Sequence, residues 1–158
     1  REYVMIEKPK LSEIKKNHFD LKFITASQWP IKNIIEKKSD AGYFNISSPA
    51  LTVTDLIHHQ TKLGGLSRML AIIEELSEEI TNEDLNDLLT WYPHRSTIQR
   101  LAFLLDEQQA DIDLSAISDY LKTGQYFPVL LSPNNNQKAG SVNNRWKVDV
   151  NIKLESDL

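Results

Sequence analysis

The sequence predicts an α+β domain in which a mixed β-sheet, built from N-terminal and C-terminal strands, packs against four or five central helices. Residues 1–46 contain short apolar runs separated by turn signals, which is typical of strands. Residues 48–124 place apolar side chains at the helical period of 3.6. Residues 145–155 alternate between apolar and polar side chains, as a half-buried strand does. Separate blocks of strands and helices favour the α+β class.

The first block contains two short apolar runs and a hairpin. YVMIE at 3–7 and DLKFITA at 20–26 are expected strands. IKNIIEKK and GYFNIS flank the stretch Ser39-Asp40-Ala41-Gly42, whose residues favour a tight turn. We therefore expect two antiparallel strands on either side of that turn.

The helical block begins at Ser48, which is expected to cap a helix whose first position is Pro49. Gly64 and Gly65 are expected to end this helix, because glycine adopts positive φ without a steric penalty. The following segment, LSRMLAIIEELSEEI, carries one apolar stripe at the helical period. Its glutamates lie largely off that stripe and are interpreted as a solvated face.

Three shorter signals complete the helices. Thr81, with Asp84 three positions later, imitates a capping box at the start of a helix that Pro93 stops. Apolar positions from 98 to 105 mark another helix. Asp113 is expected to cap a short helix that Gly124 closes.

The C-terminal segment is predicted to return to β-structure. YFPVLL at 126–131 is a short apolar run interrupted by proline, which favours an edge strand. Residues 132–144 are a polar loop. RWKVDVNIKLE at 145–155 shows strict alternation over its whole length, and we expect it to be a strand with one buried face.

The 158 residues fit a single domain, with a basic, strand-rich lead-in at 1–41 and a main body at 42–158. Residues 1–38 hold nine Lys or Arg and five Asp or Glu, although the whole chain has a formal charge of −4. A basic segment can contact nucleic acid or an acidic partner. The candidate contact residues are Lys8, Lys10, Lys15, Lys16 and Lys22. The plainer interpretation is that these lysines are simply solvated.

Several kinds of chemistry find no support in the sequence. The chain has no cysteine, which excludes disulfides and thiolate ligands, and it has no apolar run of membrane-spanning length. His58 and His59 point about 100° apart on a helix, so they do not make a zinc pair. Asp55 precedes them by one turn and is placed for an ion pair with one of them. His94 has no recognisable partner in the sequence.

No catalytic residue, cofactor or metal site is predicted, and we expect a protein that is not an enzyme. The G-x-S-x-G elbow and the phosphate-loop motifs are absent. Asp111 and Asp113 form the only D-x-D, but they precede a helix, where acids cap N–H groups.

Four stretches, GYFNISSPALTVTDLI, GGLSRMLAIIEELSEEI, QRLAFLLDE and RWKVDVNIKLESDL, together resemble the C-terminal domain of AbiEi-type antitoxins from 42 to 158. This family belongs to abortive-infection, type IV toxin–antitoxin systems of phage defence. The resemblance implies a cytoplasmic transcriptional autoregulator whose antitoxin domain counteracts a nucleotidyltransferase toxin without a tight complex. The family's N-terminal winged helix, which binds operator DNA, is expected to lie outside this chain.

Two alternatives accompany this interpretation. The first is an accessory domain of a DNA-binding regulator, serving dimerisation or contact with nucleic acid, so self-association stays open. The second is a degenerate enzyme acting on nucleotides. Clustering of Asp111, Asp113 and Asp149 around one cleft would favour the second alternative, and wide separation would count against it.

Overall fold

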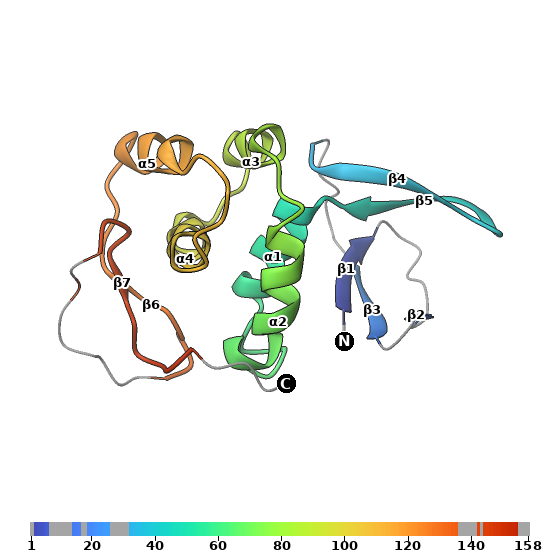
Figure 1. Cartoon of the computed structure of the whole chain (residues 1–158), viewed down its shortest axis with the longest axis horizontal. Coiled ribbons are helices and arrows are strands. Elements are labelled where there is room, and N and C mark those ends of the chain that lie inside the picture. The colour runs from blue at the N-terminus through green and yellow to red at the C-terminus, as the bar shows by residue number, and fades with distance from the viewer. Residues whose placement is uncertain are drawn as a thin grey trace.

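The computed structural model describes residues 2–6, 14–16, 19–25, 32–135, 142 and 144–154, with side chains from residue 32 onward. Within these ranges, helices lie between two groups of short strands (Figure 1). The first strands are β1 (Glu2–Ile6), β2 (Ile14–Lys16), β3 (Phe19–Thr25), β4 (Ile34–Ser39) and β5 (Gly42–Ser47). The helices are α1 (Pro49–His58), α2 (Leu66–Ser77), α3 (Asn82–Leu89), α4 (Arg95–Glu107) and α5 (Ser115–Lys122). The last strands are β6 (Val129–Leu130) and β7 (Val148–Asp149).

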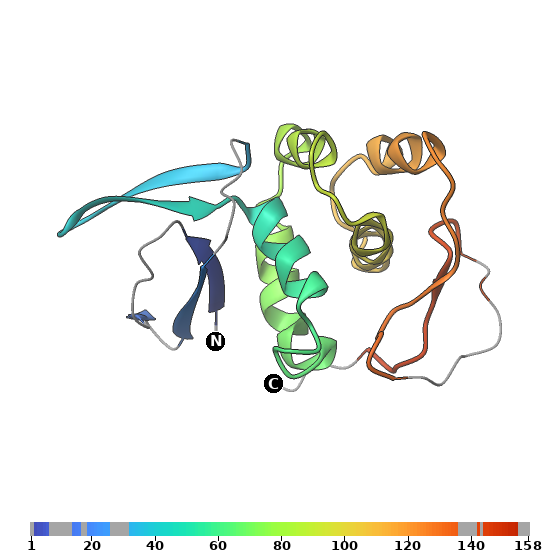
Figure 2. The same cartoon turned by 180° about the vertical axis from the view of Figure 1, so that it is seen from behind.

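The α+β class is confirmed, but the predicted sheet with strands from both ends of the chain is wrong. In the described ranges the strands form three small sheets: β1-β3-β2, β4-β5 and β6-β7. The first is mixed, because β3 pairs in parallel with β1 and antiparallel with β2. The helices separate the N-terminal strands from β6 and β7, as the view from behind also shows (Figure 2). The two ends therefore cannot share one ladder.

The predicted hairpin is confirmed as β4 and β5. Ser39 lies opposite Gly42 at the tip of the antiparallel pair. Gly42 has a φ of 119°, a conformation that glycine adopts without strain. The hairpin projects beyond the helices (Figure 1), and Tyr43 near its tip is 69% exposed. Ser48 follows it directly, and its backbone N–H donates to the carbonyl of Asn33 (2.7 Å).

The observed start of α1 agrees with the start predicted from the sequence, but its observed end does not. The hydroxyl of Ser48 accepts a hydrogen bond from the backbone N–H of Leu51, and Pro49 is the first helical residue, as expected. The helix ends at His58, earlier than the predicted stop at Gly64 and Gly65. The two glycines, with φ of 93° and 99°, instead close the turn that leads into α2.

Half of the expected capping box forms at α3. The Thr81 hydroxyl accepts from the backbone N–H of Asp84 (3.1 Å), as predicted. The Asp84 carboxylate does not complete the box at Thr81. It accepts instead from the side-chain amide of Asn33 (2.7 Å) and the backbone N–H of Ala50 (2.8 Å). The α3 start therefore ties together the base of the hairpin and the first turn of α1.

The core is formed mainly by α1, α2 and α4, with further side chains from α3, α5 and the C-terminal segment. The apolar stripes predicted for the helices are confirmed as buried faces. The largest fully buried side chains are Leu51, Ile57, Leu66, Ile73, Leu85, Leu88, Ile98, Leu101, Leu104, Leu105, Ile117 and Trp146. None of the helices in the described ranges combines the length and hydropathy that a bilayer span requires.

The strand predicted over 145–155 is wrong, because only Val148–Asp149 forms a strand within its described residues. Lys147 has a φ of 55°, which interrupts an extended run. Asp149, expected on the wet face, is 6% exposed, and Val150, expected on the dry face, is 37% exposed. The YFPVLL run likewise forms a strand only at Val129–Leu130.

Side chains from α4, and Gln60 from the turn after α1, replace the missing ladder in this region. Nε2 of Gln99 in α4 donates to the carbonyls of Phe127 (2.9 Å) and Trp146 (3.0 Å). Nε of Arg100 donates to the carbonyl of Leu130 (2.8 Å), and Nε2 of Gln60 donates to that of Leu131 (3.1 Å). The alternating pattern therefore reflects the docking of Trp146 and Val148 into the core.

Candidate functional site

Of the five lysines predicted to contact nucleic acid, the structure describes three, and these by their backbone alone. Lys8 and Lys10 lie outside the described residues. Lys15 and Lys16 belong to β2 and Lys22 belongs to β3, and these strands are neighbours in one sheet. Lys15 pairs with Asp20 in the strand register. The backbone thus brings three of the five lysines to one small sheet, and their contact with nucleic acid stays a prediction.

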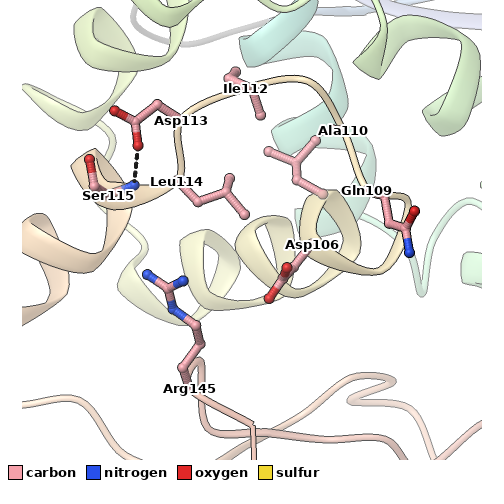
Figure 3. Close-up of a pocket in the computed structure, with 9 residues that line it drawn as sticks. Asp106, Gln109, Ala110, Ile112, Asp113, Leu114, Ser115 and Arg145 are labelled. Carbon is pink, nitrogen blue, oxygen red and sulfur yellow. Dashed lines mark hydrogen bonds between the residues drawn. The ribbon is translucent and has the colours of Figure 1, made fainter.

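The three carboxylates that would mark a nucleotide-acting enzyme do not share the pocket in which Asp113 lies. Asp113 lines a pocket of about 340 Å³ (Figure 3), whereas Asp111 and Asp149 do not line it. Oδ1 of Asp113 accepts from the backbone N–H of Ser115 (2.9 Å), the first residue of α5, but the N-cap residue is Leu114, so Asp113, the predicted cap, stands one position before it. Hydrogen bonds from Ser115 lower the pKa of the Asp113 carboxyl. The ranges with described side chains contain no group of three or more His, Asp or Glu that could hold a metal ion.

The charged residues that line this pocket help to hold the C-terminal segment. Asp106 comes from α4 and Arg145 from the C-terminal segment, and both border the pocket (Figure 3). Oδ2 of Asp106 accepts from the indole Nε1 of Trp146 (2.9 Å). The guanidinium of Arg145 lies over the Trp146 ring, 4.3 Å from its centroid. This arrangement fastens a buried tryptophan and does not converge on a reacting atom.

The most concentrated group of titratable side chains lies where α1 ends and α4 begins. We call the three imidazoles of His58, His59 and His94 the histidine cluster. The rings of His58 and His94 are stacked, with centroids 4.0 Å apart and planes inclined by 12°. The rings of His58 and His59 meet edge to face at 4.8 Å. His94 is the N-cap residue of α4, so the α3–α4 connection delivers it to the end of α1.

The expectation that His94 has no partner is therefore wrong, and sequence reasoning missed the cluster. The spacing from His58 to His94 is not a helical period, so no local pattern indicates their contact. The contact depends on how α1 packs against α4. The only sequence signal was the proline at position 93, which was predicted to stop the preceding helix; α3 ends earlier, at Leu89, and Pro93 lies in the connection directly before His94.

Asp55 does not form the expected ion pair with a histidine. Its Oδ1 accepts a hydrogen bond from the Tyr92 hydroxyl (3.1 Å), and its buried Oδ2 has no hydrogen-bond partner among the described residues. Burial raises the pKa of the Asp55 carboxyl to about 7, although the Tyr92 hydrogen bond opposes this shift. His58 instead bonds through Nδ1 to the Thr97 hydroxyl (3.0 Å). Asp55 does lie one helical turn before the two histidines, as predicted. Because it is buried beside Tyr92, however, its hydrogen-bond partner is the Tyr92 hydroxyl and not a histidine.

Two members of the histidine cluster, His58 and His59, are held in their neutral forms. Partial burial, followed by repulsion from His94, His59, Arg100 and Lys62, lowers the pKa of His58 to about 4. Burial also lowers the pKa of His59, together with repulsion from Lys62 and His94. At neutral pH the rings of His58 and His59 are therefore uncharged, and each carries one donor and one acceptor nitrogen.

Asp55 and His58 act on stability with opposite pH dependence. Between pH 3.8 and about 7 the Asp55 carboxyl ionises in the unfolded chain but stays protonated in the fold, so the free energy of unfolding falls as pH rises. Between pH 6.5 and about 4 the unfolded chain charges His58 while the fold keeps it neutral, so that free energy falls as pH drops. The two contributions oppose each other between about pH 4 and 6.5.

Replacing Asp55 with asparagine is expected to raise the free energy of unfolding by about 2 kcal/mol above pH 7. The difference between a pKa of about 7 in the fold and 3.8 in the unfolded chain limits the gain in the free energy of unfolding to about 4 kcal/mol. A buried amide without a hydrogen-bond partner takes back about 1–3 kcal/mol of this gain. Denaturant unfolding of the variant between about pH 4 and 8 should show stability rising with pH. His58→Gln is the matched control, because it should leave the opposite slope. Parallel profiles for the parent chain and both variants would contradict this assignment.

The protein is thus a small α+β domain with a cluster of imidazoles at its surface, and side-chain hydrogen bonds hold its C-terminal segment against the core. Residues 32–107 match the family model of the AbiEi antitoxin C-terminal domain. The match spans nearly half of the chain, from the base of the hairpin to the end of α4, and confirms the resemblance over that segment. No curated protein and no solved structure matches the chain. The match supports an antitoxin role in a toxin–antitoxin system, and the AbiEi antitoxins are not a family of enzymes.

Proposed function

We propose that this chain is the antitoxin domain of a type IV toxin–antitoxin system of phage defence, where it counteracts a nucleotidyltransferase toxin in the cytoplasm. The observation that supports this proposal is the match of residues 32–107 to the AbiEi antitoxin C-terminal domain. That segment contains the hairpin β4–β5 and helices α1 to α4, which supply most of the buried core. The matched part is therefore the structural centre of the domain.

In this proposal the domain binds and does not catalyse. The carboxylates of Asp106 and Asp113 accept hydrogen bonds from Trp146 and Ser115, which gives each a structural role. Operator DNA is bound by a winged helix elsewhere in the regulator, and the antitoxin domain opposes the toxin without a tight complex.

The test is growth rescue on co-expression with the neighbouring gene's product. The 158-residue chain should restore growth of cells that express a neighbour carrying Gly-Ser followed by D-x-D, the pattern of a nucleotidyltransferase. The matched control is Leu101→Asp, which buries a charge at a fully buried position of α4 and should abolish rescue by unfolding the domain. Rescue by the full-length regulator but not by this chain would place antitoxin activity outside this domain.

We propose, as a second function, that the basic N-terminal sheet contacts nucleic acid. The observation that favours it is that the backbone brings Lys15, Lys16 and Lys22 to adjacent strands of one sheet. Lysines gathered on one element are the residues that nucleic acid attracts. Charge reversal of these three together with Lys8 and Lys10 should weaken operator binding by the full-length regulator and reduce toxin neutralisation. Lys122→Glu on α5 is the control. Unchanged operator binding and neutralisation in the fivefold variant would exclude this surface.

A further inference from the structure

Phe127 is a large apolar side chain that the fold holds in solvent. It is 66% exposed, although its backbone is fixed by the interior of the domain. The Phe127 carbonyl accepts from Nε2 of Gln99 (2.9 Å), a residue of α4 that is itself buried. Pro128 follows directly and further restricts the backbone of Phe127. An exposed aromatic ring on a fixed backbone loses little entropy on binding, so it is typical of the residues that dominate protein–protein interfaces.

Two cations lie on the same part of the surface, each against an aromatic ring. Nζ of Lys147 is 4.4 Å from the centroid of the Tyr126 ring, and it donates (3.3 Å) to the Tyr126 carbonyl, which directly precedes the Phe127 nitrogen. The Arg145 guanidinium lies 4.3 Å from the centroid of the Trp146 ring. One side-chain nitrogen of α4 binds the carbonyls of both Phe127 and Trp146, so these two residues are neighbours. Arg145 and Lys147 are exposed, and with Phe127 we call them the Phe127 surface.

The pocket of about 340 Å³ offers the features that such a surface would bind. Apolar side chains and two carboxylates line it: Leu105, Ala110, Ile112, Leu114, Asp106 and Asp113 (Figure 3). A cavity of about 150 Å³ holds a benzene molecule, so the ring of a phenylalanine can enter this pocket. Each carboxylate bonds within its own chain, to Trp146 or Ser115, but its two oxygens have capacity for about four hydrogen bonds. The pocket can therefore bind a ring and neighbouring cations together.

The Phe127 surface and the pocket adjoin each other around the buried Trp146. The indole Nε1 of Trp146 donates to Asp106 at the pocket (2.9 Å), and Arg145, which covers its ring, also lines the pocket. A two-fold interface brings one surface of a molecule against the same surface of its partner, so that surface must complement itself. This region meets that requirement, because it carries both a ring and a pocket, and both cations and carboxylates.

We propose that this region is the interface of a two-fold symmetric dimer, in which the Phe127 ring of each chain enters the pocket of the other. Arg145 and Lys147 of one chain then face the carboxylates at the pocket of the other chain. Each contact occurs twice, as the symmetry requires. Aromatic residues and arginine are enriched at protein–protein interfaces, as they are here. The proposal does not depend on the antitoxin assignment.

Single-stranded nucleic acid is the less fitting occupant of this surface. Its binding sites stack successive bases on open aromatic rings. Here Lys147 covers one face of the Tyr126 ring, and Trp146 is 1% exposed beneath Arg145. Of these rings, that of Phe127 is the one open to a base, whereas a second chain would use the ring and both cations.

Sedimentation equilibrium of the full chain tests the proposal. We expect a dimer whose dissociation constant rises with salt concentration, because salt screens exposed charge pairs. Phe127→Ser should raise this constant at least about tenfold, the effect of removing a central interface residue. Tyr43→Ser is the matched control, because Tyr43 is a comparably exposed aromatic residue (69%) on the opposite side of the helices (Figure 1) and should leave dimerisation unchanged.

A mixing experiment tests whether the ring enters the pocket. Phe127→Ser removes the ring but keeps the pocket, whereas Ala110→Trp fills the pocket but keeps the ring. Neither variant alone can form a ring–pocket contact, but a mixture can form one such contact per pair. The mixture should therefore associate at least about tenfold more tightly than either variant alone. Thermal unfolding checks that both variants fold, and Asp113→Lys, which repels the cations of the partner, replaces Ala110→Trp if the latter does not.

The proposal is overturned if the parent chain remains monomeric at millimolar concentration, if Phe127→Ser dimerises as well as the parent, or if the mixture associates no better than its components. A monomeric chain that binds a short single-stranded oligonucleotide through Phe127 would assign the surface to nucleic acid and would equally overturn it. Growth rescue by Phe127→Ser reports separately on antitoxin function, so loss of the dimer and loss of antitoxicity can be told apart.

Discussion

Replacing Trp146 with alanine is expected to lower the free energy of unfolding by about 3–5 kcal/mol, the usual cost of deleting a buried aromatic side chain. Trp146 is 1% exposed, and its indole Nε1 donates to Asp106 (2.9 Å). The Arg145 guanidinium covers its ring. Truncation would leave a cavity and an unpaired carboxylate, and it would release the C-terminal segment from α4. Denaturant unfolding followed by circular dichroism measures this loss.

Trp146→Phe separates the two contributions at this position. Phenylalanine keeps most of the packing but cannot donate to Asp106, so the expected loss is smaller than that of alanine by about 2 kcal/mol. An alanine variant that loses less than about 1 kcal/mol would show that the segment is not fastened through this ring.

Asn33→Ala is the second large change, with an expected loss of about 4 kcal/mol, three from hydrogen bonds and one from backbone strain. The Asn33 amide donates to the carboxylate and the carbonyl of Asp84, both at 2.7 Å, and its Oδ1 accepts from the indole of Trp91 at 2.7 Å. Each such bond contributes about 1 kcal/mol. Asn33 also has a φ of 64°, which alanine adopts only with strain. Urea unfolding of the full chain measures the effect.

The matched control at this position is Asn33→Gly. Glycine accepts the positive φ but makes none of the side-chain bonds, so it isolates the hydrogen-bonding contribution. We expect it to lose about 1 kcal/mol less than the alanine variant. Equal losses would show that backbone strain contributes nothing here, and no loss in either variant would refute the anchoring role of Asn33.

Local signals in the sequence predicted local structure correctly. Ser48 and Thr81 cap backbone N–H groups as expected, because a cap needs only the residue and the few positions after it. Asp113 bonds the first N–H of α5 from one position before the N-cap. The hairpin turn followed from the residues of the turn itself. The buried faces of the helices followed from their apolar stripes, since packing preserves the helical period.

Contacts between residues far apart in the sequence could not be predicted from these local signals. The alternating run at 145–155 predicted a strand, but alternation only specifies which side chains are buried, and a strand also needs a partner ladder. No strand runs beside that segment over its whole length in the described residues. The histidine cluster was missed for a related reason, because His58 meets His94 only once α1 has packed against α4.

The hydrogen bonds that hold the C-terminal segment determine how freely its amino-acid sequence can vary. The donors are Gln60, Gln99 and Arg100, all inside the segment that matches the antitoxin family, and the acceptors are peptide oxygens beyond it. Every residue type carries such an oxygen. Apart from its buried side chains, Leu131, Trp146 and Val148, the segment is thus held through its backbone path. A replacement of equal length that keeps these three apolar positions should be accommodated, which leaves the other positions free to diverge among relatives.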